Sequence, residues 1–373
     1  MTQARENMGL YFRYKISVSF LLLPIIVFII IIYTLYYTNN KLSPHTRHLL
    51  IERQPSSFRP QELSSDSIGQ QTVTMVSTRS RIQNITLEDI FITVKTTRAF
   101  HRTRLSIIIK TWFQLAKNQT WFFSDADDDE YHMLTNGHLI NTNCPEGHDP
   151  DGLSCKMAKE FEAYIKSQKS WWCHFDDDNY VNTEQLVQIL AQYDIDQDWY
   201  LGKPSTTYPL SIIDRGRVMK QTTFWFATGG AGLCISKSLG LKIIPYASNG
   251  NFIRISRKIG LPDDVTLGYI IEALIQNYLI VVPQFHSHLE VMKHISKEDL
   301  YKQISYGYGR WDQRGGEVGE EEGDGEQREG GAKAGRYIDN VIQVEDGLDK
   351  SIDPTRFLSL HCKLQPSVSY CPN

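Results

Sequence analysis

Hydrophobic and polar positions alternate between strand-like and helix-like periods from residue 89 onward. Asp89–Val94 is an apolar, β-rich run that predicts a first strand, and "HRTRLSIIIKTWFQLAK" (101–117) follows with apolar residues at helical spacing. "TWFFSD" (120–125) predicts a second strand, "CKMAKEFEAYIKSQ" (155–168) an amphipathic helix and "WWCHF" (171–175) a further strand. This alternation is typical of an α/β fold with a largely parallel sheet and helices on both faces.

The same alternation continues toward the C-terminus. Asn182 or Thr183 is a candidate N-cap for the next helix. The elements expected there are a helix in "EQLVQILAQY" (184–193), strands in "DWYLG" (198–202) and "YLIVVPQF" (278–285), and a helix in "PDDVTLGYIIEALIQ" (262–276). Ligands of such sheets bind beyond the carboxyl ends of the strands, so polar residues that follow a strand are the candidates for function.

One stretch of the chain is apolar throughout. Ile16–Tyr37 carries no charge, and its 22 residues exceed the roughly 20 that a membrane-spanning helix needs. A cleaved signal peptide is the rival reading, but its apolar core would be only about 7–15 residues long. We therefore expect a cytosolic tail (1–15), a signal anchor (16–37), a Ser-, Gln-, Arg- and Pro-rich stem (38–87) and a folded domain (88–373).

The compartment of the folded domain follows from cysteines and sequons, because basic residues flank the apolar segment equally. Two sequons, at Asn84 and Asn118, lie after that segment, as do all the cysteines. An even number of cysteines suits an oxidising compartment. These features predict a single-pass type II membrane protein with its bulk in the secretory lumen. The cysteines are Cys144, Cys155, Cys173, Cys234, Cys362 and Cys371.

Composition and charge exclude some classes of partner. The chain has 373 residues, of which 41% are hydrophobic and 22% charged, as in an ordinary globular protein. Residues 314–335 hold three basic and seven acidic residues, so they account for the whole net charge of −4. No basic field remains that would favour nucleic acid. We expect this Gly/Glu-rich segment to be a disordered surface loop, and an artefact of gene prediction is the alternative.

Three consecutive aspartates, Asp176–Asp178, follow the strand expected at 171–175. In an extended chain Asp176 and Asp178 would point one way and Asp177 the other. One or two carboxylates could therefore bind a divalent cation while a neighbour contacts a polar ligand, since Mg²⁺ and Mn²⁺ use few protein carboxylates beside substrate phosphates. An acidic turn or a helix N-cap is the alternative.

Three further groups could carry chemistry. His286 and His288 end a predicted strand, and an imidazole beside carboxylates would favour Mn²⁺ over Mg²⁺. Surface or hydrogen-bonded histidines are the alternative. Asp263 and Asp264 are either ordinary acids at a helix start, or one of them is a general base whose pKa is raised by desolvation. A third group consists of arginines at a strand–helix junction, which suit phosphate unless they are a solvated helix start. These are Arg98, Arg102 and Arg104.

These motifs together resemble the Fringe glycosyltransferases. The resemblance runs from about residue 89 to residue 373, interrupted by the Gly/Glu-rich segment. It rests on "DIFITVKTT", "FHRTRL", "TNC" with "LSCKMA", "CHFDDDNYVN", "FATGGAGLCIS", "LPDDVTLGYIIEAL", "FHSHLE" and "DPTRFLSLHC" in this order. It implies a GT-A fold on a type II Golgi membrane protein. It also implies Mn²⁺-dependent, inverting transfer of N-acetylglucosamine from UDP-GlcNAc to the 3-hydroxyl of O-linked fucose on EGF repeats of Notch-type proteins.

The resemblance also implies roles for particular residues. Asp178 and His288 would bind Mn²⁺, Asp177 and Arg104 would contact the sugar nucleotide, and Asp264 would be the base. Of the fifteen pairings that six cysteines allow, it implies Cys144–Cys155, Cys173–Cys234 and Cys362–Cys371. Two alternatives stay open: a related β-1,3-glycosyltransferase with another donor or acceptor, such as galactose transfer to O-GalNAc, and a non-catalytic Golgi lectin or chaperone.

Overall fold

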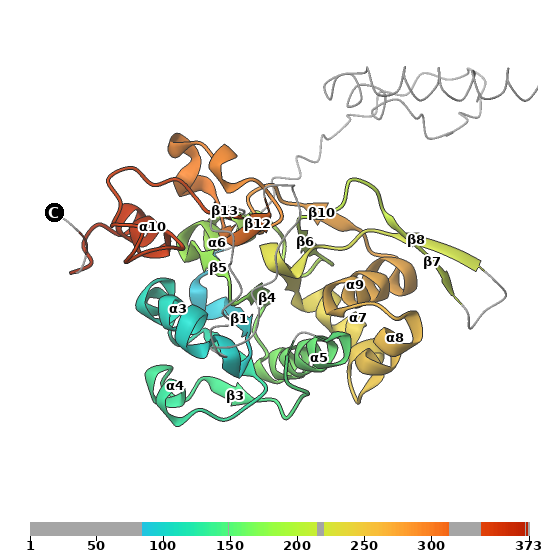
Figure 1. The fold of residues 1–373 in the computed structure, drawn as a ribbon. Helices are drawn as coiled ribbons and strands as arrows, with labels where there is room; N and C mark the ends of the chain where they lie inside the picture. Colours follow the sequence, from blue (N-terminus) through green and yellow to red (C-terminus); the bar gives the residue numbers. More distant parts are fainter. Residues whose placement is uncertain (1–83, 148, 215–219, 313–336, 370, 372–373) are drawn as a thin grey trace, which may run out of the picture. The chain divides into compact units, whose positions relative to one another are not determined.

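A seven-stranded sheet forms the centre of the computed structural model, which describes residues 84–147, 149–214, 220–312, 337–369 and 371. The strand order is β10-β6-β9-β4-β1-β2-β3 (Figure 1). The strands are β1 (Ile90–Lys95), β2 (Thr120–Ser124), β3 (Leu139–Asn141), β4 (Trp171–Asp176), β6 (Tyr200–Gly202), β9 (Leu233–Ser236) and β10 (Leu279–Val281). In this sheet β9 runs antiparallel to β4 and β6, and the other pairs are parallel. The expected α/β fold with a largely parallel sheet is confirmed.

Helices cover both faces of this sheet (Figure 1). On one face α5 (Pro150–Ser167) contacts β1 and β2, and α7 (Lys237–Ala247), α8 (Asn251–Ile259) and α9 (Asp263–Gly268) pack against α5. The core of the other face includes residues of α3 (Ser106–Lys110), α6 (Thr183–Leu190) and α10 (Phe357–Leu364). Asn182 caps α6 by accepting a hydrogen bond from the Gln185 N–H, so the first of the two cap candidates is confirmed.

Shorter elements complete the described part of the chain. The helical turns are η1 (Leu87–Asp89), η2 (Arg98–Phe100), η3 (His101–Leu105), η4 (Trp112–Leu115), α4 (Asp129–Leu134), η5 (Gly229–Ala231), η6 (Tyr269–Ile275), η7 (Met292–His294) and η8 (Lys297–Lys302). Three antiparallel pairs lie outside the main sheet: β5 (Asn179–Val181) with β11 (Ser305–Gly307), β7 (Leu210–Asp214) with β8 (Lys220–Phe224), and β12 (Gly309–Asp312) with β13 (Tyr337–Asn340).

The buried side chains of β4 alternate between the two faces. Trp171, Cys173 and Phe175 belong to the core that contains α3, α6 and α10, whereas Trp172 belongs to the core under α5. Successive side chains of a strand point to opposite faces, so this strand is apolar on both sides. His174 shares the α5 face with Trp172 and places its imidazole under the edge of the sheet where the aspartates begin.

Two expected elements are shorter than their hydrophobic patterns suggest. The helix expected over 101–117 breaks at Thr111, whose hydroxyl donates back to the Ile107 carbonyl at 2.7 Å. The break allows the fully buried Trp112 to donate its indole N–H to a backbone carbonyl of β5. The strand expected over 278–285 ends at Val281, because Pro283 has no N–H to continue a ladder and the chain turns there.

Three disulfides join the pairs that the family resemblance implies: Cys144–Cys155, Cys173–Cys234 and Cys362–Cys371. Cys173 and Cys234 are directly opposite each other on β4 and β9. Asn84 and Asn118, the two sequon asparagines, are exposed. None of the described helices is long and apolar enough to cross a membrane. The predicted anchor (16–37), most of the stem and the segment 314–335 fall outside the described residues.

Candidate active site

The carboxyl ends of β1 and β4 lie next to each other, because Lys95 and Asp176, their last residues, are register partners. The polar residues that follow both strands line one cavity of about 580 Å³ together with residues from α9 and from the segments before and after β11. The lining residues are Lys95, Thr96, Thr97, Phe100, Arg104, Leu153, Lys156, Asp176, Asp177, Asp178, Thr228, Gly229, Gly230, Pro262, Asp263, Asp264, His288, Leu289, Tyr308, Gly309 and Arg310.

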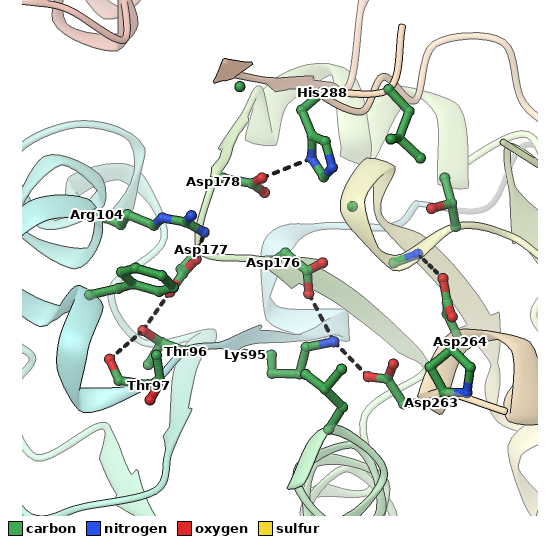
Figure 2. A pocket seen from close by; sticks show the side chains of 18 of the residues that line it. Lys95, Thr96, Thr97, Arg104, Asp176, Asp177, Asp178, Asp263, Asp264 and His288 are labelled. Carbon is green, nitrogen blue, oxygen red and sulfur yellow. Dashed lines mark hydrogen bonds and ion pairs between the residues drawn. The ribbon is translucent and has the colours of Figure 1, made fainter. Parts of the chain in front are cut away.

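The three consecutive aspartates do not alternate as an extended chain would. β4 ends at Asp176, and the chain turns at Asp177 and Asp178 before β5 begins. Figure 2 shows the result: each carboxylate points to a different partner. Asp176 faces a lysine, Asp177 an arginine and a threonine, and Asp178 a histidine. The extended chain that the expectation for these aspartates assumed therefore ends at Asp176.

Asp177 is held by both of its oxygens. The Arg104 guanidinium donates to one oxygen at 2.8 Å, and the Thr96 hydroxyl donates to the other at 2.7 Å. Burial is the largest influence on this carboxyl and raises its pKa, while Arg104 acts in the opposite direction. The same guanidinium lies 3.8 Å above the Phe100 ring. The structure thus brings together Asp177 and Arg104, the two residues that the resemblance assigns to the sugar nucleotide.

Asp178 and His288 meet although 110 positions separate them in the chain. The Asp178 Oδ2 and His288 Nδ1 atoms are 2.9 Å apart. The backbone carbonyl of His288 accepts hydrogen bonds from Asn340 at 2.7 Å and from Trp311 at 3.1 Å, which hold the backbone that carries the imidazole. A Cβ on Gly230 would lie 3.1 Å from the His288 ring, so this position has little room for a side chain.

This pair fits a divalent cation that is shared with a ligand. The Asp178 Oδ1 atom is buried and accepts no hydrogen bond from the described residues. An orphaned carboxylate oxygen beside an imidazole is a donor set that suits Mn²⁺. The described residues contain no group of three or more His, Cys, Asp and Glu side chains that could hold a metal. Further ligands would therefore come from water or from the phosphates of a substrate.

His286, the other histidine of "FHSHLE", does not line the cavity and instead contacts neighbouring side chains. Its ring nitrogens are 3.2 Å from a Glu290 oxygen and 3.0 Å from the Gln303 amide oxygen. The chain at these positions is irregular rather than extended, so the two histidines point to different surroundings. Arg98 and Arg102 do not line the cavity, in contrast to Arg104.

The two neighbouring acids at the start of α9 have different surroundings. Asp263 Oδ2 is 2.5 Å from the Lys95 ammonium. Asp264 instead accepts two backbone hydrogen bonds, from the Gly229 N–H at 3.0 Å and from the Val265 N–H at 2.7 Å. Burial and the charge of Asp263 raise the pKa of Asp264 to about 6. Asp264 is therefore ionised at neutral pH and is a stronger base than an ordinary carboxylate.

A buried network of charges lies beneath this acid. The His174 imidazole is 2.6 Å from the Glu160 carboxylate and 3.4 Å from Asp176 Oδ1. Burial by itself lowers the pKa of His174, but Glu160 and Asp176 outweigh it and raise the pKa to about 9. Lys95 connects this group to α9, since its ammonium is 3.0 Å from Asp176 and contacts Asp263 (Figure 2).

Sequence reasoning missed most of this network. Lys95 ends an apolar strand, and Lys156 lies on the buried face of α5, so a lysine at an apolar position is the signal that was available. Lys156 donates to Asp125 at 2.7 Å and to the Thr96 carbonyl at 3.0 Å. Asp125 also accepts the Thr97 hydroxyl at 2.6 Å, which shapes the loop after β1.

Fold and site define an α/β protein whose acidic cavity lies at the strand ends of a mixed sheet. Residues 85–322 match the family model described as Fringe-like. The chain is 50% identical over 289 residues to a protein named Fringe glycosyltransferase from Drosophila melanogaster. That match covers 77% of this chain and 64% of the relative. The chain belongs to the Fringe family.

Vertebrate relatives give a similar result. The chain is 42% identical over 292 residues to β-1,3-N-acetylglucosaminyltransferase lunatic fringe from Danio rerio, covering 78% of this chain and 72% of the relative. It is 41% identical over 294 residues to the radical fringe enzyme from Gallus gallus, covering 78% and 73%. Among solved structures, the galactosyltransferase LgtC in complex with donor and acceptor sugar analogues is 11% identical, with a TM-score of 0.34 and coverage of 52% of this chain and 74% of that one.

Proposed function

We propose that the chain is an inverting GT-A glycosyltransferase that moves N-acetylglucosamine from UDP-GlcNAc to the 3-hydroxyl of O-linked fucose on EGF repeats. By this modification it would modulate Notch signalling. Family membership and the printed names of the vertebrate relatives support the transferase activity. One structural observation carries the proposal: a single cavity contains Asp264, a carboxylate of raised pKa, and the Asp178–His288 pair.

Asp264 would act on the acceptor. Its carboxylate lines the cavity and is ionised at neutral pH, so it can take the proton of the attacking fucose hydroxyl. One direct displacement at the anomeric carbon needs one base and no covalent intermediate, which accounts for inversion. The hydrogen bonds from Gly229 and Val265 orient the carboxylate.

Arg104 and Asp177 would act on the donor, as a cation and a hydrogen-bond acceptor at the edge of the cavity. Asp178 and His288 would hold Mn²⁺, to which their oxygen and nitrogen atoms are suited. When bound there, Mn²⁺ would supply positive charge that stabilises the departing diphosphate. Thr96 keeps Asp177 turned toward Arg104, so that the guanidinium and the carboxylate have a fixed separation.

We further propose that the protein is a single-pass type II protein of the Golgi membrane, anchored by residues 16–37 with the domain 88–373 in the lumen. Three disulfides with no free cysteine among the described residues are typical of an oxidising compartment. The exposure of both sequon asparagines, Asn84 and Asn118, is compatible with their glycosylation there.

A transfer assay with separate radiolabelled UDP-sugars and an O-fucosylated EGF repeat tests this function. We expect label from UDP-GlcNAc to reach the repeat only when fucose is present, and chelation to abolish transfer until Mn²⁺ is restored. Transfer from UDP-galactose, or to O-GalNAc, would instead indicate a related β-1,3-glycosyltransferase. Binding of UDP-GlcNAc or of the repeat without any transfer would indicate a non-catalytic lectin or chaperone and would refute the enzyme.

A further inference from the structure

The first turn of α9 presents two adjacent carboxylates to one cavity, and the proposed base is one of them. Asp263 and Asp264 have the same chemistry and differ by one position. What distinguishes them is Lys95, whose ammonium is 2.5 Å from Asp263 and 3.0 Å from Asp176. Lys95 reaches them from the end of β1, 168 positions before Asp263.

We propose that Lys95 is a positioning residue for the transfer reaction. It holds Asp263 and Asp176 in a fixed ion-paired arrangement, so that Asp264 is the carboxylate presented to the acceptor hydroxyl. This inference rests on the proposed transferase function and deepens it by naming a residue that selects the base and sets its charge environment.

Burial makes the arrangement selective. Lys95 is 7% exposed and Asp263 is 3% exposed, so neither exchanges its partner for water. Burial would lower the pKa of Lys95, but Asp176 and Asp263 outweigh it and hold the pKa well above its usual value. The ammonium therefore stays charged. Asp263 therefore keeps its Oδ2 atom on the ammonium, because breaking this contact would leave a buried charge unpaired.

The charges that face Lys95 and Asp264 come from every packed element. α5 supplies Glu160, β4 supplies His174 and Asp176, α9 supplies Asp263, and the phenol of Tyr200 on β6 is also close to Asp264. If all these groups are charged, the two cations (Lys95 and His174) and the three carboxylates other than Asp264 (Glu160, Asp176 and Asp263) sum to one negative charge. Lys95 lowers the pKa of Asp264, whereas Asp263 and Asp176 raise it.

Substitutions at the two ends of the ion pair therefore have opposite effects. Lys95→Met removes the cation and keeps the length of the side chain, so we expect the acid limb of the kcat–pH profile to move up by about one pH unit. Asp263→Asn removes a like charge, so we expect the limb to move down. At pH 7 the shifted limb by itself should lower kcat of Lys95→Met about twofold, and loss of the fixed carboxylate arrangement should lower the plateau further, with KM for UDP-GlcNAc changed less than about threefold. Lys95→Arg keeps the charge and should restore the limb.

Lys156→Met is the matched control, because it removes another buried lysine of the same cavity. Lys156 pairs with Asp125, and the charges that act most strongly on Asp264 do not include it. Its loss should leave the position of the acid limb unchanged, whatever it does to stability. A purely structural role for Lys95 would make both methionine variants behave alike.

The readout does not depend on turnover alone. Carbon NMR of [¹³Cγ]aspartate in the full-length protein follows the titration of the Asp264 carboxyl, which is assigned by its loss in Asp264→Asn. Opposite shifts of this titration in Lys95→Met and Asp263→Asn support the proposal even if no transfer is detected, an outcome that would refute only the proposed function. If the Asp264 titration does not move in these variants, or moves in the same direction in both, the proposal is overturned. If Lys95→Met does not fold, Lys95→Gln, which also removes the charge, takes its place, and an unmoved Asp264 titration in it would overturn the proposal.

Discussion

Replacing Asp264 by asparagine separates the chemistry of the base from its structural role. The asparagine is almost isosteric, and its oxygen can still accept one of the two backbone hydrogen bonds, from Gly229 or from Val265. The substitution removes the acceptor for the hydroxyl proton and leaves Asp178 and His288 unchanged. We therefore expect binding of UDP with Mn²⁺ to persist and transfer to be lost.

The magnitude follows from the raised pKa of Asp264. General base catalysis contributes about 10²- to 10⁴-fold, so kcat at pH 7 should fall by this factor. In the wild type, the base must be ionised, and its pKa of about 6 places the acid limb there. At pH 5 the ionised fraction is about one tenth, and kcat should be about tenfold below its plateau.

The free energy of unfolding of Asp264→Asn should not fall with its activity. A carboxyl whose pKa is higher in the folded state than in the unfolded state favours folding at low pH. This contribution is lost as the pH rises through about 6. At pH 7 the ionised Asp264 thus costs at most about 3 kcal/mol, and asparagine avoids this cost while losing one hydrogen bond worth about 1–2 kcal/mol. The melting temperature of Asp264→Asn should be equal to that of the wild type or higher.

Two measurements decide this prediction. Transfer of labelled N-acetylglucosamine gives kcat across pH 5 to 9, and calorimetric titration of UDP in Mn²⁺ gives the affinity. Near-normal transfer by Asp264→Asn would refute the assignment of the base. A large loss of melting temperature would show instead that the carboxylate holds α9 in place, and the loss of activity would then carry no information about proton transfer.

Three further changes test the parts that surround the base. Asp178→Ala should weaken the binding of UDP in Mn²⁺ and leave its binding without metal unchanged; equal affinity at all Mn²⁺ concentrations would contradict the ligand role. Gly230→Ala should raise the Mn²⁺ concentration needed for half-maximal transfer, because its Cβ would press on His288, and an unaltered requirement would show that the ring can move. Replacing both Cys173 and Cys234 by alanine opens a 61-residue loop and should cost roughly 4 kcal/mol of unfolding free energy in chemical denaturation, whereas a loss near zero would contradict this estimate.

The local pattern of hydrophobic and polar residues was sufficient to predict whether most elements are helices or strands. It also predicted which edge of the sheet carries the site. The apolar runs 89–94 and 171–175 were both identified as strands. In the structure these strands end one residue later, at Lys95 and Asp176, and polar residues that follow them line the cavity. Hydrophobic periodicity reports burial, and burial is what distinguishes strand from loop here. It could not show where the 101–117 helix breaks, because the break at Thr111 depends on the packing of Trp112 against β5.

The candidate site shows the same division. Asp177, Asp178, Asp264, Arg104 and His288 were selected from their motifs, and all of them line one cavity. Motif and residue type are local properties, so they can be recognised in the sequence without knowledge of the fold. The partner of each charge is a long-range property, and in a chain of this length the possible ion pairs are too numerous to be chosen from spacing.

Sequence by itself determined an α/β chain of the Fringe family, with acids at the strand ends, a histidine available to join them and six cysteines. Tertiary structure decided which partner each acid has. The turn after Asp176 sends the three aspartates to different partners, and Lys95 and His174 supply positive charge beside Asp176. The reason is physical: the pKa of a carboxyl depends on burial and on charges within a few ångströms, and only folding brings β1, β4 and α9 to that distance.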